Sequence, residues 1–230
     1  MKIYLDRPLP PLDKFIIESE YWNHYISTVR RLVPGDSLEV AGINRVVETE
    51  IKGLDPLRVE VLSGREKESC SYSLWLIQSL TRKKKFEEAV KIGSELGVTD
   101  FLPVISDHTV RRPNNPEKQR ERWRRIATDS TRITGRDWLP RIHLPVDFYD
   151  FESQLPELDK IYWGDAAGGH PRDIFSQKDN KVAFVVGPEG DFSSEEKEYL
   201  SSRATGVSLG EKYFRAETAS IVFTTLWLYR

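Results

Sequence analysis

The fold class is indicated most directly by residues 182–196, which read VAFVVGPEGDFSSEE. The first five of these residues form an unbroken apolar run, which is typical of a strand buried on both faces. Ser193 and Glu196 have the spacing of a capping box, so we expect a helix to begin there. Such a strand, glycine turn and helix place backbone N–H groups at the carboxyl edge of a sheet, where open α/β folds bind ligands. On its own, the segment fits a purely structural turn equally well.

The chain has two parts with different patterns. Residues 70–230 alternate between strands, expected over 74–77, 101–105, 161–163, 182–186 and 206–210, and helices, expected over 85–96, 117–134, 194–204 and 217–228. This alternation predicts an α/β domain with a parallel sheet covered on both faces. Residues 1–69 predict a small β-barrel domain with a polar linker over 63–69, a helix over 21–31 and strands over 15–17, 37–40, 45–51 and 57–62.

The composition is that of a globular protein with a mixed-charge surface, since 39% of the residues are hydrophobic and 30% are charged. The net charge of −2 does not predict a general polyanion-binding protein, so a nucleic-acid surface would be a local patch. Cys70 is the only cysteine, which excludes an internal disulfide. No signal peptide or transmembrane stretch is evident, so we expect a cytoplasmic protein with no membrane partner.

Common catalytic signatures are missing from the sequence. It contains no GxGxxG after a strand, no P-loop, no HExxH, no GxSxG and no CxxC. The histidines do not have a metal-ligand spacing, so no metal is expected; they are His24, His108, His143 and His170. Metal catalysis, serine hydrolysis and an ordinary Rossmann dinucleotide enzyme are therefore disfavoured.

A second glycine turn lies at residues 209–219, LGEKYFRAETA, between a strand end and the last helix. Glu217 is near the N-terminus of that helix, where the helix dipole favours a carboxylate, so capping is its simplest role. Arg215 alone would be an ordinary surface cation. Two glycine loops, each between a strand and a helix, together indicate a ligand site more strongly than either loop alone.

The order Gly-Pro-Glu-Gly, Phe-Ser with an acidic pair, Leu-Gly, and Arg-x-Glu-Thr-Ala resembles the RsmE family of SPOUT methyltransferases. Further similarity at residues 95–98, 103–106, 123–126 and 34–36 extends the resemblance over essentially the whole chain. It implies S-adenosylmethionine as cofactor and methylation of N3 of a uridine in small-subunit (16S) ribosomal RNA, as naked RNA or in the assembled subunit. It also implies a SPOUT-type parallel sheet with a C-terminal trefoil knot, a PUA-like β-barrel that binds RNA, and a homodimer.

The resemblance assigns roles to residues of both glycine loops. The cofactor would be bound by Gly187, Pro188, Glu189, Gly190, Leu209, Gly210, Tyr213 and Thr218. Leu209 fits plain core packing as well. We expect Arg215 to hold the negative charge that develops on a uracil oxygen, and Glu217 to orient Arg215 or the base.

RNA contacts are expected at Arg31 in the first domain and at Arg111, Arg112 and Arg136 in the second. The cations between residues 118 and 125 would add positive charge to this surface. The glutamates among them fit a solvated helix face better.

Four positions of the second domain depart from the family pattern: Ile92, Arg132, Ile133 and Asp191, the last where a glycine is usual. These departures leave room for a second hypothesis, a non-catalytic RNA-binding protein with a degenerate SPOUT domain. A third hypothesis is a generic α/β nucleotide-binding enzyme with an unknotted sheet. Binding of S-adenosylmethionine separates the first hypothesis from the second.

Overall fold

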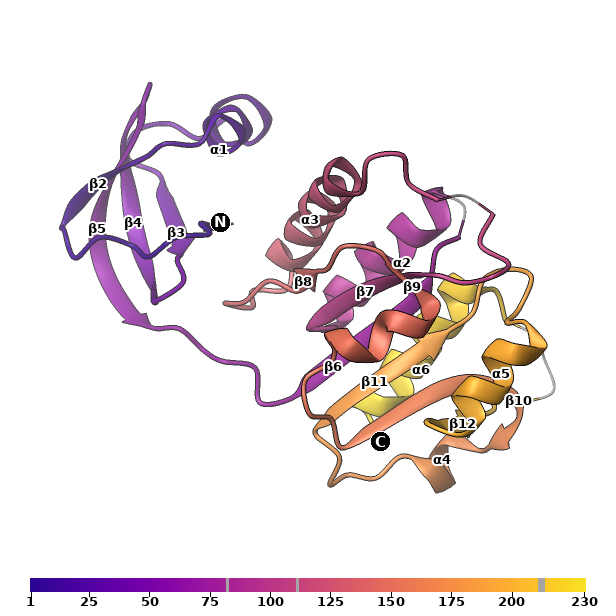
Figure 1. Cartoon of the computed structure of the whole chain (residues 1–230). Helices are drawn as coiled ribbons and strands as arrows, with labels where there is room; N and C mark the ends of the chain where they lie inside the picture. The colour runs from indigo at the N-terminus through magenta and orange to yellow at the C-terminus, as the bar shows by residue number, and fades with distance from the viewer. Residues whose placement is uncertain (82, 111, 211–213) are drawn as a thin grey trace. The chain divides into compact units, whose positions relative to one another are not determined.

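The computed structural model describes residues 1–81, 83–110, 112–210 and 214–230 (Figure 1). They form two compact units. The first unit comprises Met1–Ser69 and Gly135–Trp138, and the second comprises Cys70–Thr134 and Leu139–Arg230. The short segment Gly135–Trp138 therefore belongs to the first unit, although the sequence pattern assigns it to the second. Two predicted site residues, Arg111 and Tyr213, lie outside the described residues.

The first unit contains a five-stranded sheet in the order β1-β3-β4-β5-β2, formed by β1 (Lys2–Tyr4), β2 (Lys14–Ile17), β3 (Ser37–Ala41), β4 (Arg45–Leu54) and β5 (Leu57–Glu66). β1 pairs in parallel with β3, and the other pairs are antiparallel. Helix α1 (Glu20–His24) continues as a π-helix over Tyr25–Val29, and Trp22 and Ile26 from these turns pack into the core of the sheet. Among these strands the order ends at β1 and β2, so their pairing does not close the sheet into a barrel.

The predicted linker over 63–69 is wrong for its first residues. β5 continues to Glu66, which lies opposite Arg45 of β4 in the antiparallel pair. The ladder is held by backbone hydrogen bonds, so an exposed hairpin end needs no apolar side chains. Polar composition therefore did not reveal this part of the strand.

The second unit is built on a seven-stranded sheet in the order β12-β10-β11-β6-β7-β8, with β9 also paired to β7. Its strands are all parallel to their neighbours: β6 (Ser73–Ser79), β7 (Asp100–Ile105), β8 (Arg141–Ile142), β9 (Val146–Asp147), β10 (Lys160–Gly169), β11 (Lys181–Val186) and β12 (Thr205–Val207). The α/β class with a parallel sheet is thus confirmed. At the edge pair β10–β12 the backbones approach so closely that a Cβ at Gly168 would overlap the backbone of Gly206.

Helices cover both faces of this sheet (Figure 1). One face carries α2 (Lys83–Leu96), α3 (Pro116–Arg132) and α6 (Ala216–Leu228), and the other carries the 3-10 helix Phe148–Gln154 and α5 (Ser194–Ser201). Alternate residues of the central strands enter the two cores: Val182, Phe184 and Val186 pack with the first helices, and Ala183 and Val185 with the second. The prediction that 182–186 is a strand buried on both faces is confirmed.

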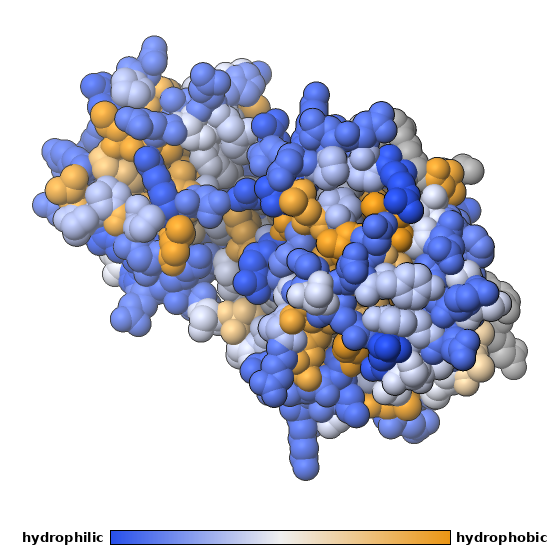
Figure 2. Space-filling view, viewed as in Figure 1, coloured by the Kyte–Doolittle hydropathy of each residue, from blue (hydrophilic) through white to orange (hydrophobic). Residues whose placement is uncertain are grey.

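Several helix ends follow the predicted signals. The capping box of Ser193 and Glu196 opens α5, and Gly97 follows α2 with a φ of 116°. Most elements that the pattern missed are short, such as β1, β8, β9 and α4 (Pro171–Ile174), because two to four residues carry no usable periodicity. The seven-residue 3-10 helix Phe148–Gln154 was also missed. The surface visible in Figure 2 is mainly hydrophilic, with scattered hydrophobic residues. Within the described part of the chain, no helix combines the length and apolar character required to cross a membrane.

Candidate active site

The site lies at the carboxyl edge of the parallel sheet in the second unit. Because β6, β10, β11 and β12 run in the same direction, their carboxyl ends meet at one edge. The loop 187–193 leaves β11 at this edge, and the segment that begins at Ser208 leaves β12 there. β11 and β12 flank β10, so the starts of the two loops are about 10 Å apart at the usual strand spacing.

The first glycine loop is packed tightly by its own neighbours. A Cβ at Gly187 would lie 3.2 Å from the Phe192 ring, and one at Gly190 would lie 3.3 Å from the Cβ of His108. Pro188 is buried, whereas Glu189 and Gly190 are exposed. The structure thus supplies an internal packing reason for both glycines, in addition to any approach of a ligand.

The second glycine loop has one conformational requirement. Gly210 has a φ of 97°, which favours glycine, and its N–H lies 3.2 Å from the Ser208 hydroxyl. Leu209 is half-buried and packs against the core that α6 shares with the sheet. This contact agrees with the core-packing role, and it leaves part of the side chain available to a ligand.

Helix α6 begins at this edge with the two predicted catalytic residues. Arg215 is the N-cap residue, and its side chain is exposed and does not cap the helix. Glu217 is buried, and its Oε1 lies 2.7 Å from the Nζ of Lys85 at the start of α2. The hydrogen bond to Glu217 raises the pKa of Lys85, so this ammonium stays charged. The residue that orients Glu217 is therefore Lys85, which sequence reasoning did not identify as part of the site.

Buried polar atoms without a partner gather near the end of β6 and the first turn of α6. At this edge, such atoms among the described residues are Gln78 Nε2, Ser79 Oγ, Thr81 Oγ1 and Glu217 Oε2; others lie elsewhere, such as Asn23 Oδ1 in the first unit and Trp123 Nε1 in α3. Ser220 joins the two elements, because its hydroxyl donates to Gln78 Oε1 at 2.8 Å. An unpaired buried polar group costs about 1–3 kcal/mol, so a cluster of them indicates a place that a polar ligand or water completes. The polar run that follows the apolar residues of β6 was the available sequence signal.

Comparison with known proteins identifies the family. The model of a family described as an RNA methyltransferase domain matches residues 68–228. The chain belongs to this family. The match covers the parallel sheet, both glycine loops and the whole of α6.

Relatives of this RNA methyltransferase carry one recurring name. The proteins called ribosomal RNA small subunit methyltransferase E from Synechocystis and from Rickettsia conorii are 28% and 27% identical to it. The matches cover 86% of this chain and 68% of the Synechocystis protein, and 96% of this chain and 91% of the Rickettsia protein. A crystal structure of the Neisseria gonorrhoeae methyltransferase of that name, bound to S-adenosyl methionine, has the same fold, with a TM-score of 0.87, 21% identity, and coverage of 97% of this chain and 94% of that one.

The predicted RNA-binding arginines of this RNA methyltransferase are divided between the two units. Arg31 is exposed in the first unit and has a φ of 55°. Arg136 also belongs to the first unit, where its guanidinium lies 5.3 Å from the centre of the Trp138 ring. Arg112 is exposed in the second unit, 3.4 Å from a carboxylate oxygen of Asp147. Their role in RNA binding stays a prediction.

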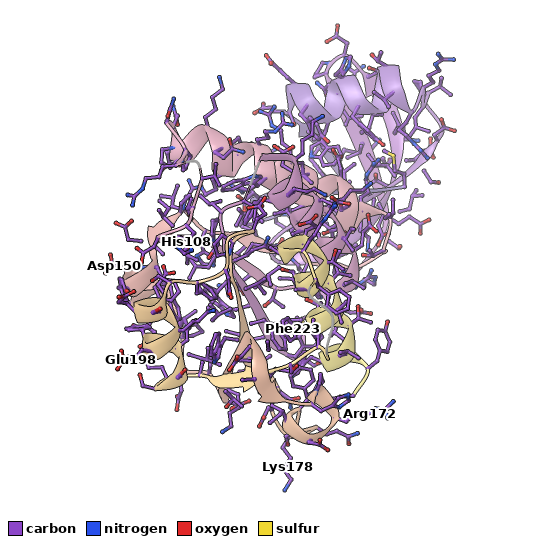
Figure 3. The ribbon with its side chains drawn as sticks, turned by 90° about the vertical axis from the view of Figure 1, so that its right-hand side faces the viewer. His108, Asp150, Arg172, Lys178, Glu198 and Phe223 are labelled. Carbon is purple, nitrogen blue, oxygen red and sulfur yellow. The ribbon has the colours of Figure 1, made fainter. Side chains whose placement is uncertain are left out.

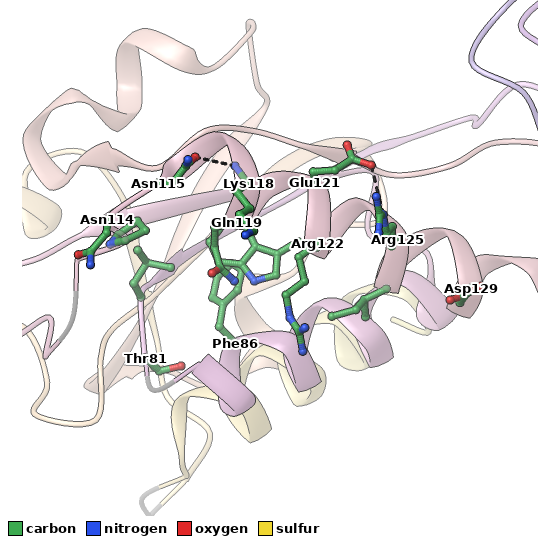
Figure 4. A pocket seen from close by; sticks show the side chains of 14 residues that line it. Thr81, Phe86, Asn114, Asn115, Lys118, Gln119, Glu121, Arg122, Arg125 and Asp129 are labelled. Atoms are coloured by element: carbon green, nitrogen blue, oxygen red, sulfur yellow. Dashed lines mark hydrogen bonds and ion pairs between the residues drawn. The ribbon is translucent and has the colours of Figure 1, made fainter. Parts of the chain in front are cut away.

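The cations of α3 are largely engaged in ion pairs. A groove of about 720 Å³ runs along this helix (Figure 4). Arg122 pairs with Glu87 of α2 at 2.6 and 2.9 Å, Arg120 lies 2.6 Å from Glu117, and Arg125 lies 3.5 Å from Glu121. Such pairing favours the solvated helix face over a surface reserved for phosphates.

Proposed function

We propose that this protein uses S-adenosylmethionine to methylate N3 of a uridine in the 16S RNA of the small ribosomal subunit. The single observation that carries the proposal is the family match over residues 68–228, which includes both glycine loops. The shared name of its relatives supports the substrate, because they are small-subunit ribosomal RNA methyltransferases that align over most of the chain. The matched region is complete at the carboxyl edge, which supports catalysis over a degenerate RNA-binding domain.

The residues at this edge fit the proposed cofactor. The loops 187–190 and 208–210 offer backbone hydrogen-bonding groups, and Leu209 offers an apolar contact for adenine. Glu217 Oε2 has no hydrogen-bond donor among the described residues, so this carboxylate oxygen can accept a hydrogen bond from a ligand. Thr218 in the first turn of α6 and Glu189 in the first glycine loop are further candidates for cofactor binding at this edge. S-adenosylmethionine, when bound, supplies an electrophilic methyl group, and the protein aligns it with the base.

Arg215 is the residue that we assign to charge stabilisation. Its exposed guanidinium stands at the N-terminus of α6, where the helix dipole adds to the positive potential. N3 of a uridine carries a proton, and negative charge spreads to the two carbonyl oxygens beside N3 as that proton leaves. A cation placed beforehand at such an oxygen lowers the barrier. Glu217 is held at one oxygen by Lys85, so its other oxygen is free to accept a hydrogen bond from the base.

We also propose the finer architecture of the family for this chain. Insertion of β11 between β6 and β10, followed by return of the chain from β12 to α6 beside α2, supports a trefoil knot at the C-terminus. The sheet and helix of the first unit support a PUA-like RNA-binding module. A homodimer is supported by exposed large side chains at the end of the chain: Leu226 of α6 is 41% exposed, and Tyr229, the residue after the helix, is 81% exposed.

The proposal is tested by incubating the protein with S-adenosylmethionine and either small-subunit RNA or assembled subunits. After digestion to nucleosides, mass spectrometry should detect 3-methyluridine from at least one of the two substrates. Calorimetry with the cofactor is run in parallel. Cofactor binding with methylation of a different atom would show that the proposed methylation site is wrong. Absence of both binding and methylation would favour the non-catalytic hypothesis.

A further inference from the structure

The loop after β7 is fastened to the first glycine loop by several contacts. The Asp107 N–H donates to Glu196 Oε1 at 2.9 Å, and the Ser193 hydroxyl donates to Asp107 Oδ2 at 2.6 Å. His108 Nδ1 lies 2.8 Å from the carbonyl oxygen of Asp191. Neither His108 nor Asp107 belongs to a motif that the sequence analysis connected with the site. His108 is labelled in Figure 3.

Glu196 does more than cap its helix. Capping uses one carboxylate oxygen, since Oε2 accepts the Ser193 N–H at 2.9 Å. The other oxygen accepts the Asp107 N–H from a different loop, and the side chain is fully buried. A buried carboxylate with both oxygens engaged by backbone donors is a rigid connection. It fixes the end of the glycine loop relative to the end of β7.

His108 contacts the glycine loop at Asp191, whose backbone conformation is unusual for a residue other than glycine. Asp191 has a φ of 63°, in the left-handed region that favours glycine. Its conformation is stabilised by its own carboxylate, which accepts the Phe192 N–H at 2.8 Å and pairs with Lys197 at 2.6 Å. With Nδ1 protonated, His108 donates to the Asp191 carbonyl, and the His108 side chain also lies directly against Gly190.

We propose that His108 and Glu196 are positioning residues for the cofactor, which act by holding the backbone of Gly187–Asp191 in its binding conformation. The inference rests on the proposed function, because it takes this loop as part of the S-adenosylmethionine site. A loop that binds through backbone groups gains affinity when it is ordered before the ligand arrives, since ordering then costs nothing on binding. The contacts from the β7 loop supply that order without touching the ligand.

Calorimetry of the full-length protein with S-adenosylmethionine tests the inference with a matched pair of variants. His108→Ala removes the donor, whereas His108→Asn keeps an N–H close to the position of Nδ1. We expect His108→Ala to raise the dissociation constant by about tenfold, a loss of the size expected for one ordering contact, and His108→Asn to restore it to within about twofold. In methylation assays, His108→Ala should raise KM for the cofactor, while kcat at saturation stays within about twofold.

Each outcome decides between positioning and a merely structural role. A thermal melt of each variant measures stability separately, because a structural role lowers Tm without changing the affinity of the folded fraction. Wild-type affinity in His108→Ala, or equal weakness of the Ala and Asn variants, would overturn the inference while leaving the proposed function intact. Failure of the unsubstituted protein to bind S-adenosylmethionine would overturn the proposed function and this inference together.

Discussion

Two groups of buried polar side chains differ in how fully their atoms are paired. In the first unit, Asp137 is 2% exposed and accepts from Lys2 Nζ at 2.8 Å, from the Glu68 N–H at 2.9 Å and from the Arg65 guanidinium. In the second unit, Glu217 is 4% exposed, and one of its oxygens has no partner among the described residues. Gln78, which Ser220 joins to the first turn of α6, also carries an unpartnered atom, as do Ser79 and Thr81 at the end of β6.

The difference separates a structural role from a functional one. Asp137 fastens the segment Gly135–Trp138 to the sheet of the first unit, and among the described residues neither Asp137 nor its partners Lys2 and Arg65 have an unpaired buried side-chain atom. The polar groups at the carboxyl edge are buried at a cost that folding alone does not recover, since unpaired buried groups are unfavourable. We infer that a bound ligand forms hydrogen bonds with these groups and so offsets the free-energy cost of burying them. The predictions below test this contrast, beginning with the largest expected effect.

Asp137→Ala should destabilise the first unit by about 3 kcal/mol, because removal of one partner leaves the buried Lys2 ammonium without its main counter-ion. Glu39 at 3.3 Å from Lys2 compensates in part. Denaturant unfolding measures the loss, with the exposed Glu18→Ala as a control of unchanged stability. A loss of less than about 1 kcal/mol in the free energy of unfolding would contradict the structural role assigned to Asp137.

Arg215→Ala should lower kcat by about 10²–10³-fold, the range found when one preorganised charge-stabilising group is lost. Its side chain is exposed and caps nothing, so the free energy of unfolding should change by less than about 0.5 kcal/mol. Methylation at saturating cofactor, together with calorimetry, separates turnover from binding. Arg203→Ala, at an exposed arginine just after α5, is the matched control, and near-normal turnover by Arg215→Ala would rule out its assigned role.

Local rules explain which parts of this structure could be predicted. The strand, glycine turn and capping box over 182–196 depend on neighbouring residues, so their pattern is visible in the sequence. Glu217 pairs with Lys85, and Asp137 pairs with Lys2. The two residues of each pair are far apart in the chain, so no local spacing predicts these contacts. The same applies to the His108–Asp191 contact, which exists only because parallel strands bring two loops to one edge.

Stability of the first unit should fall with acid through Asp137. The Arg65 guanidinium, and then Lys2, hold the pKa of this carboxyl well below its usual range. Because the folded-state pKa is depressed, the contribution is complete above the unfolded value of about 3.9 and is lost as pH falls below it toward the folded pKa. Urea unfolding of wild type and Asp137→Asn measures this contribution to stability. The range runs from about pH 3 to about pH 6, roughly one unit below and two units above the unfolded-state pKa. The stability difference between them should shrink in acid; a constant difference would contradict this pairing.

The smallest expected effect concerns two hydroxyls that are buried to the same extent. Thr49 Oγ1 in the first unit donates to the Leu38 carbonyl at 2.7 Å, whereas Ser79 Oγ in the second has no partner among the described residues. Thr49→Val should cost about 1 kcal/mol because it removes a buried hydrogen bond. Ser79→Ala should be neutral or stabilising by up to about 0.5 kcal/mol without ligand, since it removes an unsatisfied group. Thermal melts with and without S-adenosylmethionine extend the test, because a hydroxyl kept for the ligand gives wild type a larger ligand-induced rise in Tm than Ser79→Ala. Equal ligand-induced rises in Tm would mean that the Ser79 hydroxyl does not bind the ligand. Gln78, Thr81 and Glu217 would then be the remaining groups expected to do so.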